Sequence, residues 1–143
     1  MKTRTLLLLA VAVGLLILVA GTIQLLRIDE TGSSIDDLAI GASAQAGDLE
    51  VTVLSATEDG GVMRVQLRAG GVDDPGGFDD FTLVGIGAAV KPTAPAAVGD
   101  DACRAVTEAE QTCTIAFTTA ELEGSTRVLL LRRGEDQRRW SLQ

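Results

Sequence analysis

The only two cysteines of the chain, Cys103 and Cys113, have the most readily foreseen chemistry of any residues in it. An even number of cysteines outside the cytoplasm indicates a disulfide. A closed loop of about 11 residues would stabilise the fold by roughly 2.5–3 kcal/mol in the chain-entropy model. The alternative is a redox-active pair, but the Cys-x-x-Cys spacing typical of such pairs is missing. We therefore predict a structural disulfide.

Aspartates gather in two loops that could bind a hard cation. Four of them surround the turn at residues 75–77 and two lie in a later loop: Asp73, Asp74, Asp79, Asp80, Asp100 and Asp101. Calcium takes several oxygen ligands from a loop that wraps around it. The spacing matches neither an EF-hand nor a Gly-rich calcium repeat, so we interpret these loops as solvated, with calcium binding as the alternative. No metal or cofactor is predicted.

Arginines flank the turn expected at residues 134–137, and they concentrate positive charge on an otherwise acidic domain. They are Arg132, Arg133, Arg138 and Arg139. Such a cluster could contact anionic lipid headgroups, cell-envelope polymers or an acidic patch of a protein partner. The alternative is an edge hairpin that its charges protect from aggregation.

The composition argues against an enzyme and against nucleic acid as a partner. The chain has no His, so a serine nucleophile in the domain outside the membrane would have only Lys91 as a base. A carboxylate pair could serve glycoside hydrolysis, but four aromatic residues offer little for a sugar-binding cleft. The region after the apolar segment keeps 10 of the 12 basic residues against all 20 acidic ones. A phosphate backbone needs the opposite balance.

Residues 6–26 are predicted to form a transmembrane helix that contacts membrane lipid. Only Thr22 and Gln24 are polar among these 21 residues, and a helix of that length spans roughly 30 Å, the thickness of the hydrocarbon core. Lys2 and Arg4 precede the segment, whereas acidic residues follow it. The positive-inside rule therefore places residues 1–5 in the cytoplasm and the C-terminal domain outside the cell membrane.

Two other interpretations of this segment remain open. A secretory signal could be cleaved before Thr22, after the small residues Val19-Ala20-Gly21, although signal peptides have a shorter apolar stretch. A lipoprotein is excluded at that site because Thr22 stands where the lipidated Cys would be. Within the helix, Ala10, Gly14 and Gly21 share one face, which would allow close helix packing, although small residues are common in membrane helices.

Residues 27–47 are predicted to be a linker and residues 48–143 an extracytoplasmic all-β domain. Period-two alternation places Leu49, Val51 and Val53 on one strand face, and the same pattern recurs at residues 62–68 and 112–118. Further strands are expected at residues 126–131 and 138–142, with Trp140 and Leu142 in the core. Residues 81–89 form another apolar stretch, in which Gly85 and Gly87 indicate a bulge or a close approach. Six or seven short strands favour a β-sandwich.

The order and spacing of these strands resemble a family of telokin-like, immunoglobulin-type domains. The resemblance covers about residues 40–142 and lies in the segments AGDLEVTVLSA, VMRVQLRA, FTLVGIG, TCTIAFTTAEL and STRVLLLRR…RRWSL. The chain departs from the family pattern at Arg68-Ala69-Gly70, where an Asn often ends the second strand, and at Glu110-Gln111, where Pro-Gly often stands. The resemblance implies an immunoglobulin-like β-sandwich. It also implies an extracytoplasmic domain of a bacterial lipoprotein or membrane-anchored protein, with no catalytic motif.

These observations together predict a non-enzymatic, membrane-tethered extracytoplasmic module that binds or scaffolds a protein partner at the membrane or in the cell envelope. The alternative is an accessory subunit or assembly factor of a larger membrane complex, in which the helix itself packs against other helices. A third interpretation is a secreted domain that binds a ligand or an ion after signal cleavage.

Overall fold

The computed structural model describes residues 3–31 and 36–143, which belong to two compact units, Met1–Ser34 and Ile35–Gln143. The first unit is a single helix, α1 (Thr3–Thr31). Its segment Thr3–Ile23 has a mean hydropathy of 2.9 and is long and apolar enough to cross a membrane. Large aliphatic side chains are exposed on all sides of this segment, as in helices that are surrounded by lipid.

The helix extends beyond the predicted span of residues 6–26 and enters the predicted linker. It runs to Thr31 because no Gly or Pro follows Gly21 until Gly32. The linker predicted from residue 27 therefore begins too early. Small residues of the proposed packing face stay uncovered, since a side chain added at Gly14 or Gly21 would meet no atom within 4 Å.

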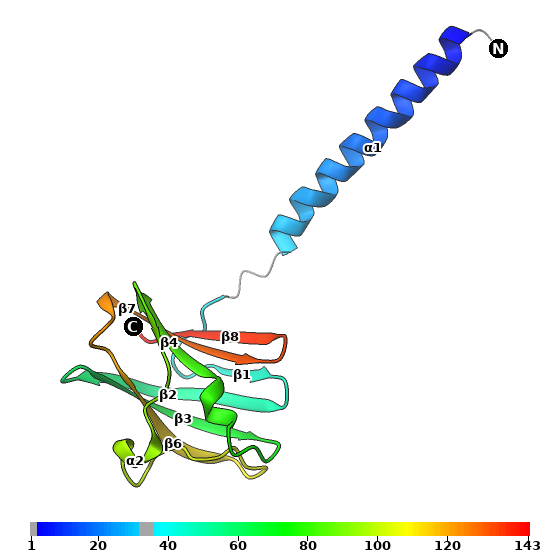
Figure 1. Cartoon of the computed structure of the whole chain (residues 1–143). Helices are drawn as coiled ribbons and strands as arrows, with labels where there is room; N and C mark the ends of the chain where they lie inside the picture. Colours follow the sequence, from blue (N-terminus) through cyan, green and yellow to red (C-terminus); the bar gives the residue numbers. More distant parts are fainter. Residues whose placement is uncertain (1–2, 32–35) are drawn as a thin grey trace. The chain divides into compact units, whose positions relative to one another are not determined.

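The second unit is a sandwich of two four-stranded sheets, both antiparallel throughout (Figure 1). Sheet I has the order β1 (Ser43–Ala46), β2 (Leu49–Asp59), β3 (Val62–Gly71), β6 (Gln111–Thr118). Sheet II has the order β5 (Ala89–Val90), β4 (Phe81–Ile86), β7 (Glu123–Arg133), β8 (Asp136–Ser141). Two short helices, η1 (Gly77–Asp80) and α2 (Pro95–Val98), lie in the connections. The predicted all-β sandwich preceded by an apolar helix is confirmed.

The core lies between the sheets and follows the predicted alternation. In β2 the side chains of Leu49, Val51 and Val53 are fully buried, and β3 alternates buried and exposed residues along most of its length. Trp140 is also fully buried, as predicted from the alternation around it. These side chains belong to one continuous hydrophobic cluster that joins the two sheets.

The bulge indicated by Gly85 is present in β4. The register of β4 against β7 shifts between Val84 and Ile86. A Cβ atom at Gly85 would lie 3.2–3.3 Å from the side chain of Leu122, so the glycine allows Leu122 to close the core there.

Part of the predicted linker belongs to the sandwich, so the domain boundary predicted at residue 48 is too late. The backbone N–H of Leu38 donates to the carbonyl of Arg139 at 2.8 Å, and Ser141 N–H donates to the carbonyl of Leu38 at 2.9 Å. The chain then crosses to sheet I as β1, where Ala42 accepts a hydrogen bond from Trp140 Nε1 at 3.0 Å. Backbone hydrogen bonds hold this segment in the sandwich, and such bonds require no periodic pattern of hydrophobic residues in the sequence.

The connection between β5 and β6 covers the opposite side of the sandwich. Thr93 N–H donates to the carbonyl of Ala116 at 2.7 Å, and Cys103 N–H donates to the carbonyl of Thr114 at 2.9 Å. These bonds occupy the outer edge of β6, which would otherwise offer unpaired backbone groups to another chain. The predicted disulfide joins Cys103 to Cys113, whose Cα atoms are 5.0 Å apart, and fastens this connection to the strand.

We expect the double variant Cys103→Ser/Cys113→Ser to lose about 2.5–3 kcal/mol of unfolding free energy, because the open chain regains loop entropy when it unfolds. Denaturant unfolding of the full chain in detergent, followed by fluorescence of the single tryptophan, measures this loss. A reductant should destabilise the wild type and leave the double variant unchanged. Two free thiols in the natively purified protein would contradict the prediction.

Candidate functional site

The strand register distributes the four predicted arginines over both faces of sheet II. Around the turn at residues 134–135, Arg133 pairs with Asp136, Arg132 with Gln137, Leu131 with Arg138, and Leu130 with Arg139. Leu131 faces the core, so alternation directs Arg133 and Arg138 inward and Arg132 and Arg139 outward. The arginines therefore do not form one basic patch.

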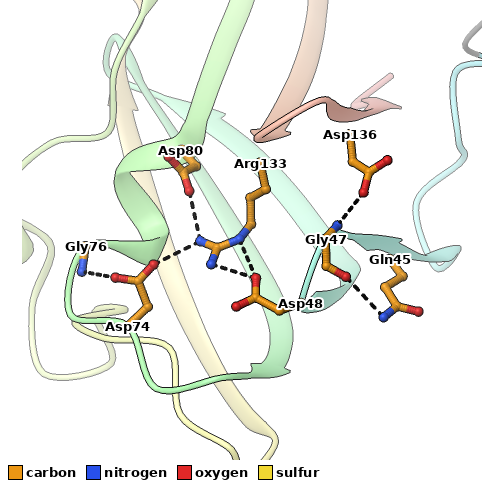
Figure 2. A network of polar contacts seen from close by, with 8 residues as sticks. All are labelled: Gln45, Gly47, Asp48, Asp74, Gly76, Asp80, Arg133 and Asp136. Carbon is orange, nitrogen blue, oxygen red and sulfur yellow. Dashed lines mark hydrogen bonds and ion pairs between the residues drawn. The ribbon is translucent and has the colours of Figure 1, made fainter.

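Arg133 holds three aspartates together at the rim of the sandwich (Figure 2). Its Nε and Nη2 atoms donate to Asp48 Oδ1 at 2.9 and 2.7 Å. Its Nη1 atom donates to Asp74 Oδ2 at 3.1 Å and to Asp80 Oδ2 at 2.9 Å. Asp48 lies in the turn between β1 and β2, Asp74 follows β3, and Asp80 ends η1. One guanidinium thus ties two connections of the domain, the turn between β1 and β2 and the connection between β3 and β4, to β7.

These contacts shift the ionisation of the groups involved. The backbone N–H of Gly76 and then the Arg133 guanidinium hold the pKa of Asp74 below its ordinary value. Burial acts to lower the pKa of Arg133, but the hydrogen bonds that Arg133 donates to Asp48 and Asp74 outweigh it, and the pKa is raised. The cluster sets three carboxylates against one guanidinium, so the positive charge of Arg133 is fully compensated inside the chain.

Other aspartates of the predicted acidic loops also have partners within the chain. Asp73 Oδ1 accepts a hydrogen bond from the backbone N–H of Glu108 at 3.1 Å. Asp101 Oδ2 accepts one from Thr114 Oγ1 at 2.6 Å, which supports the connection over β6. Among residues 3–31 and 36–143, no three acidic or cysteine side chains are grouped as a metal site would require. The cation that gathers carboxylates here is the chain's own Arg133.

A second buried arginine, Arg127, lies on the same strand and was not foreseen. Its Nε and Nη2 atoms each donate to a carboxylate oxygen of Glu58 at 3.1 Å. Its Nη1 atom donates to the carbonyls of Gly124 at 2.9 Å and Thr126 at 3.0 Å. Arg127 is only 5% exposed. Its hydrogen bond, followed by one from Thr119, lowers the pKa of Glu58. Because Glu58 belongs to β2, this pair joins sheet II to sheet I.

Two open hollows of the sandwich lie beside these arginines. One of about 410 Å³ borders the Glu58–Arg127 pair, and one of about 360 Å³ borders Arg133. The nitrogen atoms of both guanidinium groups already donate hydrogen bonds within the chain. The polar groups in these hollows therefore have structural roles.

The outer faces of the two sheets differ in chemistry. Sheet I presents polar side chains to solvent: Glu50, Thr52, Thr57, Arg64, Gln66, Arg68 and Thr112. The outer side of sheet II carries aliphatic side chains, which we call the aliphatic face: Val84, Ile86, Ala89 and Leu130 around the buried Val128, with Thr82, Arg139 and Ser141 beside them. Arg132 is exposed at one end of this face. A soluble sheet normally carries polar residues on its outer side, so the aliphatic face is the candidate contact surface of the domain.

No family model matches this chain, and no curated protein matches it in sequence. Among solved structures, it is similar to the secreted protein MPT63 of Mycobacterium tuberculosis. The match has a TM-score of 0.51 and 13% sequence identity, and it covers 76% of this chain and 99% of that protein. At this identity the similarity shows the fold alone. It supports the β-sandwich, and it does not support the telokin-like family.

Replacing Arg133 with Met should destabilise the domain by about 2–3 kcal/mol, since three carboxylates would lose their cation. The loss stays below that of a fully buried pair because the three aspartate side chains are 35–43% exposed. The neighbouring Arg132→Met is the matched control, with an expected change within about 0.5 kcal/mol. Denaturant unfolding compares the two variants, and equal effects would contradict the structural role of Arg133.

The domain should lose stability on acidification. The folded-state pKa values of Glu58 and Asp74 lie below the ordinary values of 4.5 and 3.8. The unfolded chain therefore binds more protons near these values, and the stabilisation is present above about pH 5 and lost as the pH falls toward 3. Melting temperatures between pH 7 and 3 test this. The fall should be shallower in Arg133→Met, which removes the partner of Asp74.

Proposed function

We propose that this protein is a non-enzymatic contact module that α1 tethers to the membrane and that binds a protein through the aliphatic face. The observation that carries the proposal is the contrast between the two outer faces of the sandwich. Burying several aliphatic side chains against a partner is favourable at about 25 cal/mol per Å², whereas the polar outer face of sheet I offers no such gain.

The fate of the other candidate features supports this choice. Arg133 and the acidic loops hold the fold together, and the outer edge of β6 is paired with the connection that precedes it. Leu38 covers part of the edge of β8 in the same way. Strand addition at these edges would have to displace existing hydrogen bonds, so a face is the better contact surface.

An extracytoplasmic location agrees with the disulfide and with the secreted structural neighbour. We favour a retained anchor over a cleaved signal because α1 continues without a break through Ala20 and Gly21 to Thr31. The apolar region of a signal peptide is shorter, about 7–15 residues. Sequencing the N-terminus of the mature protein tests this choice, and a mature protein that begins at Thr22 would contradict it.

The second candidate function is an accessory subunit whose helix packs against other membrane helices. The small residues Ala10, Gly14 and Gly21, which share one face of α1, favour it. Exchanging residues 3–31 for an unrelated membrane anchor separates the two functions. A contact module should keep its partners after the exchange, whereas an accessory subunit should lose them.

We expect Leu130→Glu, which places a charge in the aliphatic face, to reduce binding of the partner at least about 10-fold, because a carboxylate there would be desolvated on contact. The matched control is Gln66→Glu on the outer face of sheet I. Quantitative co-purification from the native membrane in mild detergent compares both variants with the wild type. A partner that both variants retain, or that both lose, would contradict the role of the aliphatic face.

A further inference from the structure

We infer that residues 91–102, which we call the strap, are locked onto β6 by the disulfide and keep β6 from pairing with β6 of a second copy of the chain. The redox state of Cys103 and Cys113 then decides whether this edge of sheet I is closed or open to another strand. The inference is independent of the proposed function, because the aliphatic face belongs to sheet II. Its evidence is the incomplete pairing between the strap and β6.

The strap and Cys103 pair with only some of the backbone groups at the edge of β6. Alternate residues of a strand point their N–H and C=O groups away from the neighbouring strand, and in β6 these residues are Thr112, Thr114, Ala116 and Thr118. Thr114 donates to the carbonyl of Asp101 at 2.8 Å and accepts from the N–H of Cys103 at 2.9 Å. Ala116 accepts from the N–H of Thr93 at 2.7 Å. The other edge groups of the four residues have no hydrogen-bond partner in the part of the chain that the structure describes, so a regular strand would bind this edge more completely.

The strap has few contacts of its own that hold it on β6. Pro92 and Pro95 lack the N–H group that further pairing would need. Of the twelve residues of the strap only Val98 and Ala102 are buried. With Ala116 of β6 they form a small hydrophobic cluster separate from the main core. A segment with so little buried apolar surface opens readily unless it is tied down, and the disulfide that follows it supplies this restraint.

The sequence of β6 makes an open edge prone to self-association. Its residues Gln111–Thr118 (QTCTIAFT) include no charged residue, no Gly and no Pro. Uncharged segments of this length with high β-propensity pair with identical segments when their edge is exposed. Antiparallel pairing of two β6 strands has two-fold symmetry, so each copy supplies the backbone groups that the other needs. Confinement of both copies to one membrane by α1 would raise their effective concentration.

Closing the strap permanently is a two-electron oxidation. The thiols of Cys103 and Cys113 lose two electrons and two protons as the Sγ–Sγ bond forms. A disulfide oxidant such as oxidised glutathione takes them up and becomes two thiols. Once formed, the bond is protected, since the two cysteines are only 3% and 6% exposed. A chain that is not yet oxidised therefore has the open edge, and disulfide formation closes it.

Amide hydrogen exchange of the full chain in detergent tests whether the disulfide holds the strap. In Cys103→Ser/Cys113→Ser the N–H of Thr114, which donates to the strap, should exchange at least about 10-fold faster than in Arg133→Met. The two variants are matched, because both are expected to lose a similar unfolding free energy and only the first releases the strap. The N–H of Ile115 points toward β3 and should exchange at similar rates in both. Equal exchange of Thr114 in the two variants would overturn the inference.

Sedimentation of the same preparations tests the partner. Cys103→Ser/Cys113→Ser should form dimers or larger species at concentrations where Arg133→Met sediments like the oxidised wild type. Adding Thr112→Lys and Thr118→Lys should weaken this association at least about 10-fold, because charges on an edge oppose strand pairing. Both threonines are exposed in the oxidised protein, so the lysines leave the fold intact. The inference is wrong if the cysteine variant associates no more than Arg133→Met, or if the lysines leave its association unchanged.

Discussion

The sandwich depends on the two cations that β7 directs into it. The inward side of this strand carries Arg127, Leu129, Leu131 and Arg133 in succession, so a guanidinium closes the core at either end. A buried guanidinium without a partner costs several kcal/mol, and the carboxylates that balance these two come largely from elsewhere in the fold. Glu58 reaches Arg127 from sheet I. Asp48, from the turn between β1 and β2, reaches Arg133 (Figure 2). The two sheets are thereby held to each other at both ends, with the leucines packed between.

This constraint decides which surfaces are left for function. Several charged residues that the sequence offers for binding instead pair with each other inside the fold. Arg133 of the last hairpin donates hydrogen bonds to Asp74 and Asp80 in the acidic loop after β3. The sides of the sandwich are partly closed by backbone pairing, at Leu38 beside β8 and at Thr93 and Cys103 beside β6. The remaining feature without a structural reason is the outer surface of sheet II. The candidate site is therefore defined by what the structural interactions do not explain.

Local patterns in the sequence were sufficient to predict the strands and the fold class. Alternation located β2 and β3, the spacing of glycines located the bulge at Gly85, and the cysteine count gave the disulfide. What could not be predicted depends on contacts between distant segments. Arg127 lies two residues before Leu129, so alternation places both side chains on the buried face of the strand. The sequence around Arg127 does not, however, identify its partner Glu58, which lies 69 positions away. The segment after residue 36 has no hydrophobic period, and backbone bonds to β8 include it in the sandwich.

The order of residues at Arg127-Val128 departs from what a sandwich strand needs. A strand with one solvated face alternates apolar and polar residues, as β3 does from Met63 to Arg68. In β7 the polarity is inverted at this point, because the charged residue faces the core and the aliphatic residue faces outward. The ion pair with Glu58 explains why the charged residue Arg127 faces the core. Val128 faces outward, yet it is only 9% exposed, so neighbouring side chains of the domain already cover most of it. An uninterrupted run of Val and Leu is the pattern of a strand covered on both faces. A partner bound to the aliphatic face, as proposed above, would complete the cover of this outer side around Leu130, which is half-buried in the isolated domain.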